Sequence, residues 1–327
     1  MPSPSSPSLA PSSSPIGVFD SGIGGLSVLQ ALRHELPHEH FVYLADSGHA
    51  PYGERGDAFV IERTRRIAHY LLATHGIKAL VIACNTATAA AVELLRAELP
   101  QLPLIGVEPA IKPAARSSQT HHVGVIATRG TVQSPRFARL VREHGDHTQV
   151  HVQACDGLAR AIERSTQPAP GMDPMQETTA LCAQYTRALG TFGVKTGQID
   201  TLVLGCTHYI FAKDILRQIV GADVHIIDTG APVARQTRRM LMQAGTLAPE
   251  PAAALSAPDL EASDRATAPL APAHQITLLT TGTLSALQAA AQRWLDLPAS
   301  CCHAMASDVP ELPAPASPAL PGQLATP

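Results

Sequence analysis

Two stretches, KALVIACNTATAA (78–90) and DTLVLGCTHYIFA (200–212), predict the fold of this chain of 327 residues. In both, an apolar run rich in Val, Ile and Leu leads through Ala or Gly to a cysteine, and polar residues then open a helix. A nearly continuous apolar run is typical of a strand buried on both faces of a parallel sheet. Cys84 and Cys206 are separated by about the length of one α/β domain. We therefore expect the two stretches at equivalent places in two similar domains.

Further apolar runs alternate with helix-length segments along the chain. The additional predicted strands are IGVF (16–19), FVYLA (41–45), PLIGV (103–107), VGVIA (123–127), VHVQA (150–154), VHIID (224–228) and ITLLT (276–280). Segment 57–75 is predicted to be a helix, with Arg63, Arg65 and Arg66 on its solvated surface rather than in a phosphate-binding patch. The alternation predicts an α/β fold with mainly parallel sheets, and the repeat around the two cysteines predicts two pseudo-symmetric domains.

Composition excludes several classes of protein. Hydrophobic residues make up 45% of the chain, aromatic residues only 4%, and the net charge is −3, so a nucleic-acid-binding face is not expected. No apolar run reaches the roughly 18 residues of a membrane span. The N-terminus lacks the pattern of a secretory signal, and the six cysteines show neither a disulfide framework nor zinc-site spacing. We expect a reduced, cytoplasmic protein without a metal.

Three stretches rich in Pro, Ser and Ala are predicted to be disordered: 1–15, 247–274 and 297–327. Such compositions bury too little apolar surface to offset the entropy of ordering the chain. Cys301 and Cys302 fall in the last stretch, where exposure would leave their thiols prone to oxidation.

Cys84 and Cys206 are the leading candidates for chemistry. Each follows a predicted strand and precedes a helix, which is where ligands bind in open α/β sheets. The positive end of a helix dipole favours a thiolate, so we expect lowered thiol pKa values. The alternative is that each is a small buried apolar residue. The polar residues that follow each one, Asn85-Thr86 and Thr207-His208, favour the chemical role.

Two loops near predicted strand ends offer further candidates. FDSGIGG (19–25) has glycines for tight turns but lacks a full dinucleotide-binding pattern. Asp20 is expected either to hold a substrate ammonium group or to orient an acid–base group, and a helix N-cap is its plain alternative. The turn Pro51-Tyr52-Gly53 offers backbone N–H groups to a carboxylate, although an ordinary loop has the same composition.

Taken together, these segments resemble the glutamate racemases, cofactor-independent members of the aspartate/glutamate racemase superfamily. The resemblance covers about residues 16–246 and 275–296. The motifs that carry it are FDSGIGGLSVL (19–29), YLADSGHAPYG (43–53), ACNTATA (83–89), GVEPAIKPA (106–114), GVIATRGTVQS (124–134), GCTHY (205–209) and DTGAPVA (228–234).

The resemblance implies that two cysteines on opposite sides of the substrate invert its α-carbon without a cofactor. Cys84 would take the proton from D-glutamate and Cys206 from L-glutamate, with Asp20 and His208 tuning the thiols. The implied substrate contacts are Asp20, Ser21, Tyr52, Gly53, Asn85, Thr86, Thr207 and His208. Thr131 is a further implied carboxylate contact, and Glu163 aligns with an acid near the site.

The resemblance also implies the domain layout, with the active site at the interface between the two domains. The first domain would comprise 16–110 and 222–296, and the second 111–221. The resemblance further implies that the protein supplies D-glutamate for peptidoglycan. A homodimer is one assembly that it allows. Three alternatives stay open: an aspartate or hydantoin racemase on the same scaffold, a non-catalytic amino-acid-binding protein, and a thiol redox protein. The last is disfavoured because no second cysteine lies near either candidate thiol in sequence.

Overall fold

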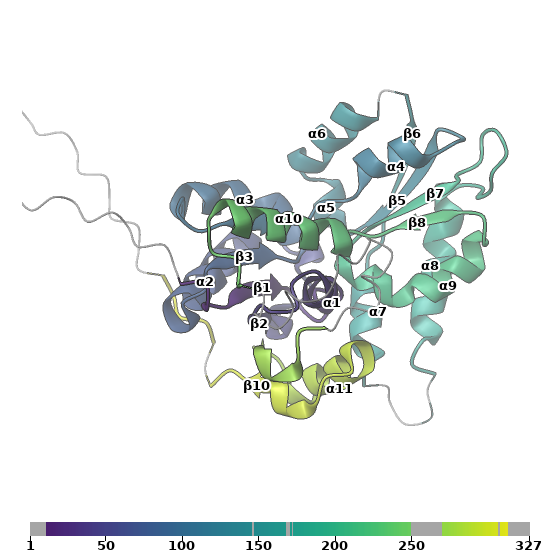
Figure 1. The fold of residues 1–327 in the computed structure, drawn as a ribbon. Coiled ribbons are helices and arrows are strands. Elements are labelled where there is room, and N and C mark those ends of the chain that lie inside the picture. The colour runs from purple at the N-terminus through teal and green to yellow at the C-terminus, as the bar shows by residue number, and fades with distance from the viewer. Residues whose placement is uncertain are drawn as a thin grey trace, which may run out of the picture.

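The computed structural model describes residues 11–145, 147–167, 171, 173–249, 270–306 and 308–312. Two parallel sheets form two lobes, with helix α1 (Leu26–Glu35) lying between them (Figure 1). The first sheet has six strands in the order β10-β9-β2-β1-β3-β4, and the second has four in the order β6-β5-β7-β8. Every pairing in both sheets is parallel, which confirms the predicted α/β class.

The nine predicted strands all form. The strands are β1 Ile16–Asp20, β2 Phe41–Ala45, β3 Ala79–Ile82, β4 Leu104–Gly106, β5 His122–Ala127, β6 Gln149–Ala154, β7 Thr201–Gly205, β8 His225–Ile227, β9 Ile276–Thr280 and β10 Cys302–Ala304. The other α-helices are α2 Asp57–His75, α3 Asn85–Glu98, α4 Ile111–Ser117, α5 Arg129–Val132, α6 Pro135–His144, α7 Leu158–Arg164, α8 Gln176–Leu189, α9 Lys213–Val220, α10 Gly230–Gln243 and α11 Leu284–Leu295. The short 3₁₀ helices near the site are η1 Ser47–His49, η2 Tyr52–Glu54 and η3 Thr207–Ala212.

The internal repeat predicted from the two cysteine stretches is present in the topology. The order β2-β1-β3-β4 in the first sheet corresponds to β6-β5-β7-β8 in the second. Strand β3, which precedes Cys84, therefore has the same place as β7, which precedes Cys206. The two thiols lie at equivalent points of two similar units.

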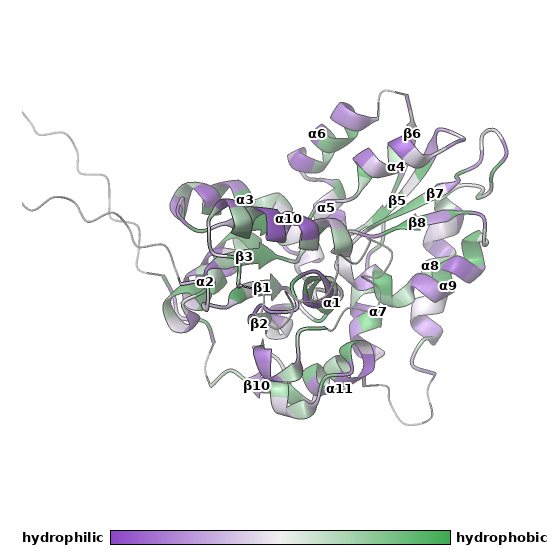
Figure 2. Ribbon diagram, in the orientation of Figure 1, coloured by the Kyte–Doolittle hydropathy of each residue, from purple (hydrophilic) through white to green (hydrophobic). Residues whose placement is uncertain are grey.

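Apolar layers cover both faces of the first sheet. One layer joins the sheet to α1, α10 and α11, and the other joins it to α2 and α3. Alternate residues of β1 enter opposite layers, with Val18 on one side and Phe19 on the other. The strands are accordingly apolar, whereas outward-facing helices such as α6 carry many polar residues (Figure 2). Burial on both faces explains the continuous apolar runs in the sequence.

The second sheet is also sandwiched between helices. The helices α7, α8 and α9 pack on one face, and α4 and α6 on the other. Strand β8 pairs with β7 through Leu202 and Ile226, so it belongs to this sheet. The boundary expected at residue 222 was therefore placed too early, because the chain completes β8 before α10 returns it to α1.

The C-terminal stretch differs from its prediction as a disordered tail. Residues 302–304 form β10 at the edge of the first sheet, paired with β9. Cys301 and Cys302 are buried in the apolar layer beneath α11, so their expected exposure was wrong. The composition misled the prediction because a strand of three residues leaves almost no pattern. Residues 313–327 lie outside the described residues.

The other two predicted disordered stretches lie largely outside the described residues, at 1–10 and 250–269. The described part of the leader is tied to the sheet, since Lys78 donates to the carbonyl of Ser12 and forms a buried ion pair with Glu39 at 2.5 Å. Within the described part of the chain, no helix has the length and apolar character to cross a membrane.

Candidate active site

The strand order brings the candidate residues to the two places where ligands bind in such sheets. In each sheet the connections diverge between the first and third strands of the repeat, and ligands bind at the carboxyl ends of such strands in open α/β sheets. Asp20 ends β1 and Cys84 follows β3. Thr128 follows β5 and Cys206 follows β7. Each of these two places thus has one thiol and one other polar side chain.

Cys84 caps helix α3. The backbone N–H of Ala87 donates to its sulfur at 3.5 Å, and the thiol donates to Oγ of Ser21 at 3.7 Å. The side chain is only 5% exposed. Burial raises the pKa of the Cys84 thiol well above its ordinary value, and the charge of Asp20 raises it further. The helix N-terminus does not overcome these effects, so the expected lowering of this pKa was wrong.

Asp20 is fully buried beside Cys84. Its Oδ2 accepts from the N–H of Gly25 at 2.7 Å, while Oδ1 has no partner among the described residues. Burial raises the pKa of the Asp20 carboxyl to about 6, although the nearby His208 opposes the rise. A buried oxygen without a partner is costly, so Oδ1 is set to receive a donor from a ligand or water.

Cys206 has a different set of neighbours. His208 places Nδ1 at 3.7 Å from the sulfur, and its Nε2 lies 2.8 Å from Oε1 of Glu163 on α7. Burial lowers the pKa of His208, but its hydrogen bonds to Cys206 and Glu163 outweigh this and raise it well above the ordinary value. The protonated form of the ring is therefore favoured, and Nδ1 is placed against the Cys206 sulfur.

Glu163 joins the second sheet's helices to the glycine-rich loop of the first. Its Oε1 also accepts from the N–H of Ile23 at 2.7 Å. The glycines of that loop are required by this approach: a Cβ on Gly22 would lie 1.8 Å from Oε1 of Glu163, and one on Gly24 would lie 2.2 Å from Nδ1 of His208. The glycines of this loop therefore allow it to pack closely against the second lobe.

The two thiols interact electrostatically with each other. A charge on Cys206 raises the pKa of Cys84. Both side chains are less than 10% exposed, with Cys206 at 7%. The structure thus brings the two predicted thiols into one buried region.

Hydroxyl and amide donors surround this region. Thr86, at the start of α3, lies 2.9 Å from Thr128 across the lobes, and Thr128 donates to Thr131 at 2.9 Å. Both amide atoms of Asn85 are buried without a partner among the described residues. Thr207 is buried and accepts at its carbonyl from Ser27 at 3.2 Å. Sequence reasoning missed Thr128, although its position directly after β5 is the signal that marks it.

Tyr52 and Gly53 lie in η2, opposite Thr128. The Tyr52 hydroxyl donates to Oδ2 of Asp46 at 2.5 Å. A Cβ on Gly53 would lie 2.6 Å from Cβ of Thr128, so only glycine allows the loop to come this close. The Pro-Tyr-Gly turn is therefore part of the contact between the lobes.

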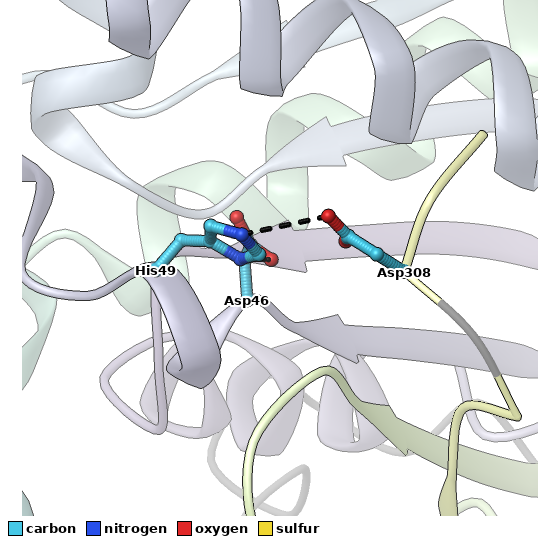
Figure 3. A group of neighbouring side chains, drawn as sticks. All are labelled: Asp46, His49 and Asp308. Carbon is cyan, nitrogen blue, oxygen red and sulfur yellow. Dashed lines mark hydrogen bonds and ion pairs between the residues drawn. The ribbon is translucent and has the colours of Figure 1, made fainter. Parts of the chain in front are cut away.

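Among the described residues, one group has the ligand types of a metal site: Asp46, His49 and Asp308, whose donor atoms lie within 4.8 Å of one another (Figure 3). Arg63 occupies this space, because it donates to both Asp46 and Asp308. A guanidinium in that position repels a cation, so the group is an ion-pair network.

The sequence of this chain is similar to those of a family of racemases. The family described as Asp/Glu/Hydantoin racemase matches residues 16–237. The chain belongs to this family. It is 49% identical over 243 residues to the glutamate racemase of Ectopseudomonas mendocina (strain ymp), which covers 74% of this chain and 88% of that protein. The glutamate racemase of Pseudomonas paraeruginosa (strain PA7) is 48% identical over 75% of this chain and 88% of its own length.

Solved structures agree with the sequence comparison. The crystal structure of glutamate racemase isoform RacE1 from Bacillus anthracis has a TM-score of 0.68 and 32% identity, over 87% of this chain and 95% of that one. Escherichia coli glutamate racemase, in complex with L-glutamate and the activator UDP-MurNAc-Ala, has a TM-score of 0.67 and 28% identity, over 86% and 95%. The chain is an amino-acid racemase with the two-domain racemase fold.

Proposed function

We propose that this protein interconverts L- and D-glutamate by two-base proton transfer between Cys84 and Cys206. The observation that carries the proposal is the placement of two buried thiols at equivalent strand ends of two similar lobes. Inversion at a carbon requires a base on one face and an acid on the other. Two lobes related by pseudo-symmetry supply such opposite groups. The name of the substrate comes from the relatives.

The charges around the two thiols favour a different starting role for each, one as the base and the other as the acid. His208, whose pKa is raised, lies 3.7 Å from the Cys206 sulfur, and in its protonated form it donates to Cys206 as the thiolate that we propose. Burial keeps Cys84 protonated. For L-glutamate, the Cys206 thiolate removes the α-proton, and the Cys84 thiol delivers its own proton to the opposite face. One S–H bond forms as the other breaks, and the reverse direction exchanges the two roles.

The intermediate between these transfers carries negative charge on the α-carbon and its carboxylate. An α-proton beside a carboxylate is weakly acidic, so fixed donors in a dry site must stabilise this charge. Asn85, Thr86 and Thr207 are placed for this role, with Thr131 as a further contact. The unpartnered amide of Asn85 supports it, because a buried amide gains most from a ligand that completes its hydrogen bonds.

The remaining assignments complete the proposed site. Asp20, with its free Oδ1, receives the substrate ammonium group, and Ser21 orients the Cys84 thiol. Tyr52 and Gly53 contact the substrate from the first lobe, and His208 acts on Cys206. The reaction as proposed uses no cofactor.

The cellular role proposed here is supply of D-glutamate for peptidoglycan, in the cytoplasm, without a nucleic-acid or membrane partner. A homodimer is proposed as the assembly. These follow from the family resemblance and from the composition of the chain.

Circular dichroism of a glutamate solution tests the activity. With catalytic amounts of purified protein and no added pyridoxal phosphate, the signal of L-glutamate should decay to zero, and that of D-glutamate should decay to the same end point. Cys84→Ala and Cys206→Ala should each abolish the decay. A signal that stays constant with wild-type protein contradicts the proposal and favours a binding protein. L-Aspartate in place of glutamate tests the alternative substrate.

A further inference from the structure

The fully buried carboxylate of Asp46 anchors the loop that carries Tyr52. Its Oδ2 accepts from the Tyr52 hydroxyl at 2.5 Å and from Nε of Arg63 at 3.0 Å. Its Oδ1 accepts from Arg63 at 2.6 Å and from Thr281 at 2.8 Å, and lies 3.1 Å from Nδ1 of His49. Five contacts from four side chains thus fix this carboxylate, and through its Oδ2 it fixes the Tyr52 ring.

Arg63 is itself held from its other side by the C-terminal segment. The guanidinium donates to both carboxylate oxygens of Asp308, each at 2.9 Å. The Arg63 residue is only 3% exposed, so its unpaired N–H groups would have little water to replace Asp308. His49 also lies between the two carboxylates, with Nε2 at 3.5 Å from Asp308 (Figure 3). The sequence-based placement of Arg63 on a solvated surface was therefore wrong.

Each residue of the segment 308–310 contacts side chains of helix α2. Val309 is fully buried in the apolar layer that contains Val60 and Ile67. Arg66 donates to the carbonyl of Val309 and, at 3.0 Å, to that of Pro310. Burial raises the pKa of Asp308, but hydrogen bonds from Arg63 and from the Val309 N–H lower it more. The carboxylate is therefore charged, although it is partly exposed.

This segment lies beyond residues 16–237, which match the racemase family. It is connected to the site by a chain of contacts from Asp308 to Arg63, Asp46 and Tyr52. Each link is a charge-assisted hydrogen bond, the strong kind in proteins. A change at the first link leaves buried N–H groups of Arg63 without an acceptor, and the guanidinium then gains by turning toward water.

We propose that residues 308–310 act as a strap across helix α2, and that Asp308 is a positioning residue for racemisation, acting through Arg63 and Asp46 on Tyr52 and Gly53. The effect on turnover rests on the proposed function of Tyr52 and Gly53 as substrate contacts. The effect of the strap on the loop that carries Tyr52 and Gly53 does not depend on that proposed function. Asp308 touches no substrate in this proposal, and the strap fixes the loop before substrate binds.

Asp308→Asn tests the strap and retains Val309 in its buried place. Glu311→Gln, an exposed acid on the same segment, is the matched control. Because a lost hydrogen bond weakens the hold on the loop rather than the chemistry, we expect KM for L-glutamate to rise about threefold to tenfold, with kcat nearly unchanged. Hydrogen exchange of the amides in 47–54 should rise. Asp308→Glu should restore both values, and Glu311→Gln should change neither.

A double-mutant cycle tests the route of the effect. In a Tyr52→Phe background the hydroxyl that Asp46 holds is absent, so Asp308→Asn should then add little to KM. A folded Asp308→Asn variant with unchanged KM and unchanged exchange in 47–54 overturns the proposal, as does an equal effect of Glu311→Gln. If wild-type protein does not racemise glutamate, the proposed function fails, while the exchange measurement still decides whether the strap holds the loop.

Discussion

The two thiols of the site have unlike surroundings. Cys84 is a thiol held by Ser21 and the N-terminus of α3, whereas Cys206 faces the ring of His208. The same strand end therefore raises the thiol pKa in one lobe and places a histidine ring against the thiol in the other. A racemase benefits from this asymmetry, because one turnover needs one acid and one base at the start.

Asp20 gives the site a pH dependence with a defined sign. Its carboxyl pKa is about 6 in the folded protein against an ordinary 3.8. The folded protein therefore binds this proton more tightly than the unfolded chain. The stabilisation is fully present below pH 3.8 and is lost as the pH rises through about 6. The shift corresponds to about 3 kcal/mol in the free energy of unfolding.

Urea unfolding between about pH 4 and about pH 7 measures this contribution. Asp20→Asn should flatten the fall in stability across that range, because the amide does not titrate. Asp57→Asn, which removes an exposed carboxylate at the start of α2, should leave the slope unchanged. Equal slopes in wild type and Asp20→Asn would show that Asp20 titrates normally.

Residues next to strand ends were predictable, and residues that act through contacts between lobes were not. Cys84 and Cys206 could be found from the apolar runs before them. Thr128 was missed because its value depends on Thr86 reaching it from the other lobe. The sequence predicts no role for Asp46, because the residues next to it in the chain do not reveal that Arg63 joins it to Asp308.

At the scale of elements, the loop holding η2 depends on the absence of a side chain at Gly53. A Cβ there would lie 2.6 Å from Cβ of Thr128, whereas a Cβ on Gly56 in the same loop meets nothing within 4 Å. Gly53→Ala should lower kcat/KM for glutamate by about tenfold or more, because overpacking costs about 1–3 kcal/mol. Steady-state assays of both variants check this, with Gly56→Ala close to wild type. Equal activities would contradict the close contact.

The position of strand β10 predicts that the cysteines of the C-terminal stretch are protected from alkylation. Because Cys301 and Cys302 are buried beneath α11, neither should be alkylated rapidly by iodoacetamide in the native protein. Both should be modified after unfolding in guanidinium, and mass spectrometry of the peptides distinguishes the two conditions. Rapid native labelling of both would support the exposed tail that composition alone predicts.

Elements of regular pattern were predicted closely. Helix α2 spans the predicted 57–75, and each of the nine apolar runs matches its strand to within one residue at either end. The sheet membership of β8 and the existence of β10 were not predictable from pattern. Both are three-residue edge strands, and tertiary pairing rather than a periodic sequence defines them.

For the whole molecule, the decisive feature is how the lobes meet. Glu163 on α7 reaches the N–H of Ile23, and Arg160 on the same helix pairs with Glu54 at 2.8 Å. These contacts and the Thr86–Thr128 pair join the lobes, and both thiols are buried. Exclusion of water strengthens the electrostatic interactions on which the proposed proton transfer depends. The enclosure follows from two copies of one topology facing each other.

The central claim is that two thiols act from opposite faces of one substrate, and isotope incorporation in deuterated water tests it most directly. Starting from L-glutamate, the D-glutamate formed early should carry deuterium at the α-carbon, while the L-glutamate recovered at the same time should remain largely unlabelled. This pattern is expected because the product receives its proton from the opposite thiol, whose hydrogen exchanges with solvent. Early D-glutamate that retains protium, or racemisation that survives both Cys84→Ala and Cys206→Ala, would contradict the account.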